Sequence, residues 1–288
     1  MAFDSNFRFL GKEYPLLLNI GQSAEYYLHA DPVVALSKLR FWGEKVSELL
    51  FDEHYLDFPY DNTFHNRLKT LEFEGILPSR VKDLLFMIKK KGNIAVHDHK
   101  GSVDEAKTGL WGAFKVAKWF YETYSEENRD ISEVRFSVPP DLDARHALHL
   151  LEEEKKALEE KYNALLETRK TGQISEEKAK EIKERSAKAA KKIEMSESET
   201  RELIDAQLRQ AGWEADTNRL NFRTQRTLPQ RGKSMAIAEW PVGSKWADYA
   251  LFIGQELYGI VEAKKYAQDI STDLGQSKIY AELAEEIH

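Results

Sequence analysis

The chain has 288 residues, no cysteine and a formal net charge of −7. Without cysteine it can form no disulfide framework and no thiolate metal site. The N-terminus has no basic stretch followed by an apolar one, and no run approaches the roughly 18 apolar residues of a membrane span. We therefore expect a soluble, cytoplasmic protein without a membrane partner, whose acidic total argues against general nucleic-acid coating but is compatible with a local DNA site.

Residues 1–140 carry long patterns with the helical period. Apolar residues recur at helical spacing in 32–51, and further helices are predicted over 81–90 and 104–124. We expect an all-helical accessory domain. The last of these helices carries an aromatic stripe whose spacing is typical of a packed core rather than of a base-stacking surface, namely Trp111, Phe114, Trp119 and Phe120.

Residues 141–195 are predicted to form a charged, coiled-coil-like helical arm. Two prolines in the segment SVPPDLD (137–143) break the preceding pattern, and 151–195 holds 11 acidic and 12 basic residues. A narrow apolar stripe with heptad spacing is interrupted at Thr171-Gly172, and Ser175 resembles a new N-cap. The arm is either a two-helix hairpin or one long helix.

From residue 196 onward the pattern is mixed. A helix capped by Ser196 or Ser198 precedes apolar runs near 235–240, 246–253 and 257–263, and another helix is predicted over 274–286. The predicted fold class is α+β: a helical domain, a helical arm and a mixed sheet flanked by helices. Because the chain stops within an apparent helix, we expect it to be part of a longer protein.

Charged residues interrupt two of the predicted strands. Strand alternation places Asp248 on one face with Ala250 and Phe252, and Glu262 on one face with Lys264. With a hairpin turn at 254–256, an antiparallel pair would bring both carboxylates to the same end of the sheet. Carboxylate oxygens suit Mg²⁺, which can activate a water next to a phosphate, and a nearby ammonium can position that water.

These residues also carry a resemblance to a known family. Asp248, thirteen intervening residues and then Glu262-x-Lys264 resemble the PD-(D/E)xK nuclease core. Together with Gln276 and Tyr280, this sequence segment is similar to the N-terminal nuclease domain of the R subunit of type I restriction enzymes. The position of the motif's proline holds Ala247.

The resemblance implies an endonuclease domain over 196–288 and a role for each residue of the motif. Asp248 and Glu262 would bind the metal, Lys264 would be the catalytic lysine, and Gln276 and Tyr280 would support cleavage or touch the DNA backbone. The family often has a further acid on the first helix of the core. Glu199 is preferred here and Glu202 is the alternative.

The function implied is Mg²⁺-dependent cleavage of duplex DNA. In the family, DNA cleavage follows ATP-driven translocation. The motor domain that binds ATP would therefore lie beyond residue 288. Modification and specificity subunits would be the protein partners, and the fragment alone would cleave weakly or not at all.

A basic segment precedes the predicted strands. Residues 218–233 contain five cations and no acid. The segment could bind phosphates next to the site, or it could be an ordinary polar connection. The residues expected to contact DNA are Arg223, Arg226, Arg231, Lys233 and Lys265.

Two other functions compete with the nuclease. The chain could be a non-catalytic module that docks partner subunits, with its carboxylates serving structure. It could also cleave RNA, because Asn93-x-x-x-His97 resembles the signature of small helical domains that include ribonucleases, although Gly92 stands where those enzymes usually have arginine.

Overall fold

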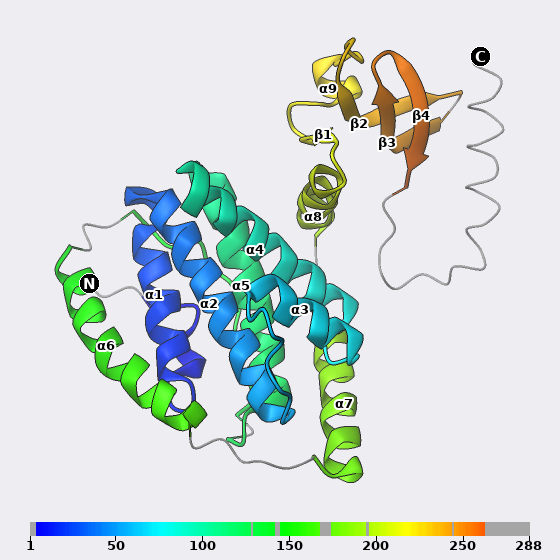
Figure 1. Ribbon diagram of the computed structural model, residues 1–288. Coiled ribbons are helices and arrows are strands. Elements are labelled where there is room, and N and C mark those ends of the chain that lie inside the picture. The colour runs from blue at the N-terminus through cyan, green and yellow to red at the C-terminus, as the bar shows by residue number, and fades with distance from the viewer. Residues whose placement is uncertain are drawn as a thin grey trace. The chain divides into compact units, whose positions relative to one another are not determined.

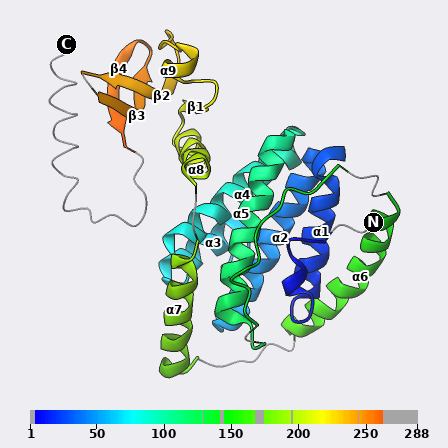
Figure 2. The ribbon, with the colours of Figure 1, turned by 180° about the vertical axis from the view of Figure 1, so that it is seen from behind.

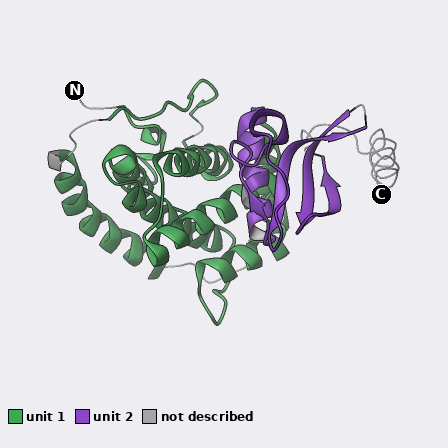
Figure 3. Cartoon of the chain, turned by 90° about the horizontal axis from the view of Figure 1, so that it is seen from above, with its two compact units in different colours: residues 1–194 green, residues 195–288 purple. Residues whose placement is uncertain are grey.

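The structure is a computed structural model that describes residues 4–127, 129–141, 145–167, 174–193, 196–243 and 245–262. The chain divides into two compact units, Met1–Glu194 and Met195–His288 (Figure 3). The α+β class is confirmed, because the first unit is helical in its described residues and the second contains a mixed sheet.

In its described residues the first unit forms a short 3₁₀ turn and seven α-helices. Their bounds are η1 Arg8–Leu10, α1 Pro15–Ala30, α2 Pro32–Glu53, α3 Phe64–Phe73, α4 Ser79–Asp98, α5 Val103–Tyr124, α6 Arg145–Glu167 and α7 Glu176–Lys191. The three helices predicted from the sequence are thus confirmed as α2, α4 and α5.

Local sequence signals explain where these helices start. The Asp31 side chain accepts a hydrogen bond from the backbone N–H of Val34 at the start of α2, and Pro32 occupies the first position. At α5, Ser102 and Glu105 form a reciprocal capping box.

Helices α1, α2, α4 and α5 lie side by side and pack around a common core (Figures 1 and 2). Trp42 and Phe120 are fully buried there, and the whole aromatic stripe of α5 is buried, which confirms its core role. Close packing also fixes a glycine: a Cβ atom at Gly92 on α4 would lie 2.3 Å from the Cβ of Arg40 on α2.

The charged segment differs from the predicted arm. Helix α6 packs against α1, whereas α7 packs against α5, and the two helices lie on different sides of the bundle (Figure 1). The Tyr162 hydroxyl donates to the Lys45 carbonyl at 3.0 Å, and the indole N–H of Trp119 donates to the Ser186 hydroxyl at 3.1 Å. The narrow apolar stripes are therefore covered by the bundle rather than by each other. The N-cap at Ser175 is confirmed.

The second unit begins with α8 Glu197–Gln210 and continues with β1 Glu214–Ala215, α9 Phe222–Gln225, β2 Ser234–Val242, β3 Lys245–Ile253 and β4 Glu256–Val261. The strands of its described residues form one sheet in the order β1-β2-β3-β4, with β1 parallel to β2 and the other pairs antiparallel. The Ser196 cap is confirmed. The helix predicted over 274–286 lies outside the described residues.

Two apolar clusters sandwich this sheet. On one face, Leu208 and Ile204 of α8 pack with Ala236, Ala238 and Tyr249. On the other, Phe222 of α9 packs with strand residues that include Met235, Ile237, Ala250 and Phe252. The sheet is therefore covered on both sides over its central strands.

A membrane-spanning helix would need greater length and apolarity than any helix has in the part of the chain that the structure describes.

Candidate active site at the end of the β3–β4 hairpin

The two predicted metal ligands lie at the same end of the sheet. Strands β3 and β4 are antiparallel, and the outermost pair in their register is Tyr249 opposite Val261. Asp248 precedes this pair on β3 and Glu262 follows it on β4, so the expected common end is confirmed. One carboxylate oxygen of Glu262 is shielded from solvent. Lys264, Lys265, Gln276 and Tyr280 lie outside the described residues.

The Asp248 carboxylate is held by an arginine from α8. Arg201 Nη2 lies 3.4 Å from Asp248 Oδ1, and the two side chains are 15% and 26% exposed. The same nitrogen lies 3.6 Å from Glu239 Oε1 and 3.2 Å from Glu197 Oε1. One cation thus serves three carboxylates, which would repel one another without it.

Glu239 is a functional candidate that sequence reasoning missed. In the β2–β3 register it falls opposite Asp248, between the pairs Ala238–Tyr249 and Trp240–Ala247. Its backbone has a φ of +50°, which is uncommon for a residue other than glycine and is typical of a locally strained site. The available signal was the single acid in the apolar run 235–240, the same anomaly that drew attention to Asp248.

Next to the irregularity at Glu239, the contacts of Asp248 differ from those expected from strand alternation. Ala250 and Phe252 share the face that α9 covers, as expected. The Asp248 carboxylate, however, pairs with Arg201 of α8, the helix that packs on the opposite face. Strict alternation was wrong for Asp248 because the adjoining strand departs from regular β geometry directly across from it.

A hydrogen-bond network fastens α8 to β3 beside this cluster. The Tyr249 hydroxyl lies 2.7 Å from the Thr217 hydroxyl and 3.3 Å from the Arg201 carbonyl. Thr217 in turn donates its backbone N–H and its hydroxyl to the Asp205 carboxylate at 2.7 and 3.0 Å. Burial raises the pKa of Asp205, while these hydrogen bonds oppose the increase. The network fixes the stretch of α8 that presents Arg201.

Glu199, the preferred helix acid, has a capping role in the structure. Its carboxylate accepts the backbone N–H of Ser196 at 2.7 Å at the first turn of α8. Within the described residues no contact joins Glu199 to Asp248, whereas Glu197 and Glu239 meet Asp248 through Arg201. Glu202, the alternative, is half-buried on the same helix.

The basic segment is spread over several local contacts. The Arg223 guanidinium lies 5.4 Å from the centre of the Trp246 ring, and that of Arg226 lies 5.5 Å from the Phe222 ring. Lys233 pairs with Glu214 at 3.1 Å, so its charge is partly compensated. Arg231 donates to the side chain of Gln255 at 3.2 Å. A role of these residues in DNA binding remains a prediction.

The residues of the ribonuclease alternative lie in the last two turns of α4. Asn93 is half-buried and His97 is exposed. Gly92, where the related enzymes have arginine, is required by the close approach of α2. No arginine can replace it without moving these helices apart.

The carboxylates at the sheet end provide the donors that a divalent cation needs. Asp248 and Glu262 offer hard oxygen ligands, and Asp248 already binds a cation in the form of the Arg201 guanidinium. Within the described residues, no group of three or more acidic, histidine or cysteine side chains is arranged as a metal site. Asp248 and Glu262 carry oxygen atoms of the kind that Mg²⁺ takes as ligands.

Comparisons with known proteins agree with the resemblance. Residues 214–288 match the family model of the type I restriction enzyme EcoKI endonuclease subunit, second domain, and residues 22–135 match a domain of unknown function, DUF4145. The chain is 29% identical to the type I restriction enzyme EcoKI endonuclease subunit of Escherichia coli strain K12 over 335 aligned positions. This alignment covers 98% of the chain and 28% of the relative, so the chain spans less than a third of that relative's length.

No solved structure matches the chain. The resemblance to the endonuclease subunit of type I restriction enzymes, inferred from the motif around Asp248 and Glu262, is confirmed by similarity along nearly the whole chain.

Proposed function

We propose that the chain is the N-terminal part of the R subunit of a type I restriction enzyme and that its second unit is a Mg²⁺-dependent endonuclease acting on duplex DNA. The observation that supports this most strongly is the antiparallel register that brings Asp248 and Glu262 to one end of the sheet, within the segment that matches the endonuclease subunit.

Asp248 and Glu262 are the residues that would hold the metal, and Lys264 would position the attacking water. When bound, the ion would make a water more acidic and would neutralise charge that develops on the phosphate. Water adds to phosphorus, the bond from phosphorus to the 3′ oxygen breaks, and the products carry 5′-phosphate and 3′-hydroxyl ends. In this proposal, the specificity and modification subunits would recognise the DNA sequence. A motor domain beyond residue 288 would drive translocation with ATP.

Arg201 has a positioning role in this proposal. Its guanidinium keeps Asp248 and Glu239 together across β2 and β3 although both are acids. A divalent cation at Asp248 would supply the same compensation, so Arg201 holds the carboxylates in place before the cation binds. The hydrogen bonds of Tyr249 with Thr217 and with the Arg201 carbonyl fasten α8 to this end of the sheet.

The test is cleavage of supercoiled plasmid by the full-length protein with its partner subunits, ATP and Mg²⁺. Asp248→Ala and Lys264→Ala should each lower the rate by at least roughly 100-fold, the typical effect of losing one electrostatic stabiliser of the transition state. Glu256→Ala, at the opposite end of β4, is the matched control and should cleave like the wild type. Undiminished cleavage by both site variants would reject the nuclease assignment.

The non-catalytic docking module remains the alternative, and metal binding separates the two. A docking module whose carboxylates serve structure alone would bind neither Mg²⁺ nor Mn²⁺ at Asp248. The ribonuclease alternative has its own test, because His97→Ala would then abolish RNA cleavage while leaving plasmid cleavage unchanged.

A further inference from the structure

A charged groove runs along the first unit, far in sequence from the candidate active site. The C-terminal half of α5, one side of α7 and the segment 129–136 enclose two adjoining cavities of about 340 and 350 Å³. Both cavities are lined by Glu122, Ala189 and Lys192, so they adjoin one another, and together we call them the α5–α7 groove.

The α5–α7 groove is basic although the chain is acidic. Its lining contains seven cations and three carboxylates, a net charge of +4 in a chain whose total is −7. The cations are Lys115, Lys118, Arg129, Arg135, Arg185, Lys188 and Lys192, and the acids are Glu122, Asp130 and Glu133. Such a local excess of positive charge attracts anions irrespective of the total charge.

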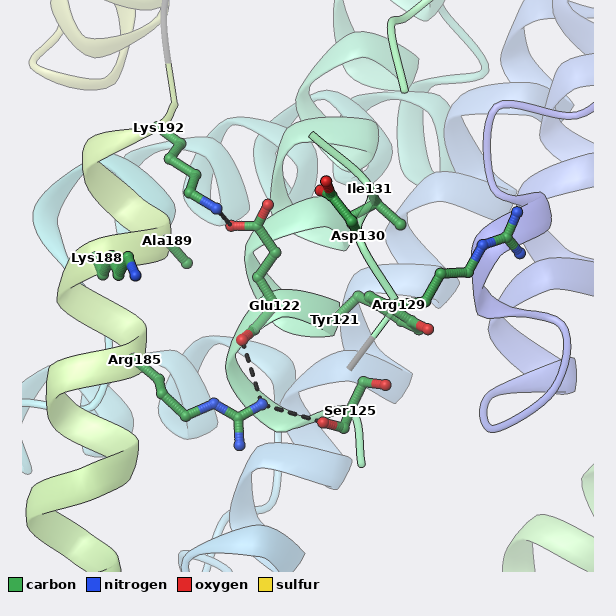
Figure 4. A pocket seen from close by; sticks show the side chains of 10 residues that line it. All are labelled: Tyr121, Glu122, Ser125, Arg129, Asp130, Ile131, Arg185, Lys188, Ala189 and Lys192. Atoms are coloured by element: carbon green, nitrogen blue, oxygen red, sulfur yellow. Dashed lines mark hydrogen bonds and ion pairs between the residues drawn. The ribbon is translucent and has the colours of Figure 1, made fainter. Parts of the chain in front are cut away.

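Arg185 and Lys118 are each held by two neutral acceptors. Arg185 Nη2 donates to the backbone carbonyls of Glu122 and Ser125 at 3.3 and 3.0 Å, as Figure 4 shows at the end of α5. Lys118 donates to the carbonyls of Ser132 and Val134 at 3.3 and 3.0 Å. Carbonyl acceptors hold both side chains in place without cancelling their formal charge. Because they are already ordered, less conformational entropy is lost when an anion binds.

The remaining cations differ in how far their charge is compensated. Lys192 Nζ lies 3.1 Å from Glu122 Oε2, so this carboxylate within the groove already has a counter-ion (Figure 4). Lys188 is exposed on the same side of α7 as Arg185 and Lys192, at helical spacings of three and four residues. Arg135 has a side chain that is 71% exposed, lies 3.7 Å from Glu133 and donates a hydrogen bond to the backbone carbonyl of Ser132. Lys188 and Arg135 are therefore accessible to a ligand from solvent.

We infer that the α5–α7 groove binds the sugar–phosphate backbone of duplex DNA. Two adjoining cavities with cations along both suit a chain of phosphates better than a single ion. The preorganised Arg185 still has N–H donors besides those it gives to the carbonyls, and guanidinium groups match phosphate geometry. The choice of DNA among nucleic acids rests on the proposed function, whereas the choice of a phosphate backbone rests on the groove itself.

The experiment measures binding of a fluorescent 30-base-pair duplex to the full chain by anisotropy, between 50 and 200 mM salt, without divalent cations. Lys188→Glu with Arg135→Glu should weaken binding about 10-fold at the lowest salt concentration. The slope of log affinity against log salt should fall in magnitude by about 2, because each lost phosphate contact removes about 0.9 from it. Both side chains are exposed, so the double variant should fold, which circular dichroism verifies.

The matched control is Lys180→Glu with Lys183→Glu. These lysines are exposed on α7 outside the groove, and the control alters the net charge by the same amount. It should bind within about two-fold of the wild type. Equal losses in both double variants, or no loss in the groove variant, would overturn the proposal, as would tighter binding of a duplex RNA of the same length.

Asp248→Ala distinguishes this inference from the proposed function. Asp248→Ala should leave the groove's contribution to DNA binding unchanged. When Asp248→Ala is added to both double variants, the groove variant should still bind DNA more weakly than the control. Undiminished plasmid cleavage by Asp248→Ala would contradict the nuclease, whereas an unaltered salt slope in the groove variant would contradict the groove alone.

Discussion

Glu25 of the helical unit and Asp248 of the sheet unit are acidic side chains that their surroundings hold in opposite ways. In the helical unit, Glu25 is only 2% exposed and accepts hydrogen bonds from the backbone and side-chain amides of Asn6 at 2.9 and 2.7 Å. In the sheet unit, Asp248 is partly exposed and is paired with a guanidinium. Neutral donors in a closed site serve packing, whereas a solvent-reachable acid with a cation partner can exchange that cation for another.

This contrast explains which charges are suited to chemistry. Burial raises the pKa of Glu25 to about 7, so that this side chain is partly neutral at physiological pH and ties the N-terminal segment to α1. The Asn6 side chain also donates to the backbone carbonyl of Ser137 and accepts from its backbone N–H, which connects the N-terminal segment to residue 137. Asp248 and Glu239 depend on Arg201 instead, and a divalent ion could replace that arrangement.

The largest expected effect is on the helical core. Trp119→Ala removes a buried ring and its hydrogen bond to Ser186 on α7, and should lower the free energy of unfolding by about 3–5 kcal/mol. Hydrogen exchange resolved by peptide should show the loss of protection in residues 4–193 and not in 196–262. An equal loss in both units would break the comparison, because it would mean that they unfold together.

The next effect concerns pH and Glu25. A folded pKa raised from 4.5 to about 7 stabilises the protein fully below pH 4.5, and this stabilisation disappears as the pH rises through 7. Its size is roughly 3 kcal/mol at most. Glu25→Gln cannot ionise, so its free energy of unfolding, measured in urea from pH 5 to 8, should lack that decline. A wild-type decline that persists in Glu25→Gln would assign it to other groups.

A smaller effect is expected at the junction of α8 and the sheet. Asp205→Ala leaves the backbone N–H and hydroxyl of Thr217 without their acceptor and should cost about 1–3 kcal/mol. Asp205→Asn keeps one acceptor oxygen and should cost less. Urea unfolding of the two variants sharpens the comparison, because a full loss in both would mean that the negative charge, rather than hydrogen bonding, holds α8.

Regular periodicity made most of the helical unit predictable. The residues of α2, α4 and α5 repeat at helical spacing, and Ser175 and Ser196 mark helix starts that the structure reproduces. The packing of α6 and α7 was not predictable in the same way. Their narrow apolar stripes indicate that each helix packs against another element, but they do not identify that element. The partner residues Lys45 and Trp119 are distant in sequence from α6 and α7.

The candidate site was predictable only in part. Strand alternation and the turn at Gly254 were sufficient to place Asp248 and Glu262 at one end of the sheet. The same alternation failed to give the direction of the Asp248 carboxylate, because the positive φ of Glu239 interrupts the neighbouring strand. Arg201 was missed as a partner since it comes from a helix 47 residues away in sequence.

The most direct test of the central claim is to measure Mn²⁺ binding to the full chain by titration calorimetry. Wild-type protein should bind Mn²⁺, Asp248→Ala and Glu262→Gln should each weaken binding at least roughly 10-fold, and Glu256→Ala should bind like the wild type. Equal Mn²⁺ binding by the wild type, Asp248→Ala and Glu262→Gln would contradict a metal site at these two carboxylates.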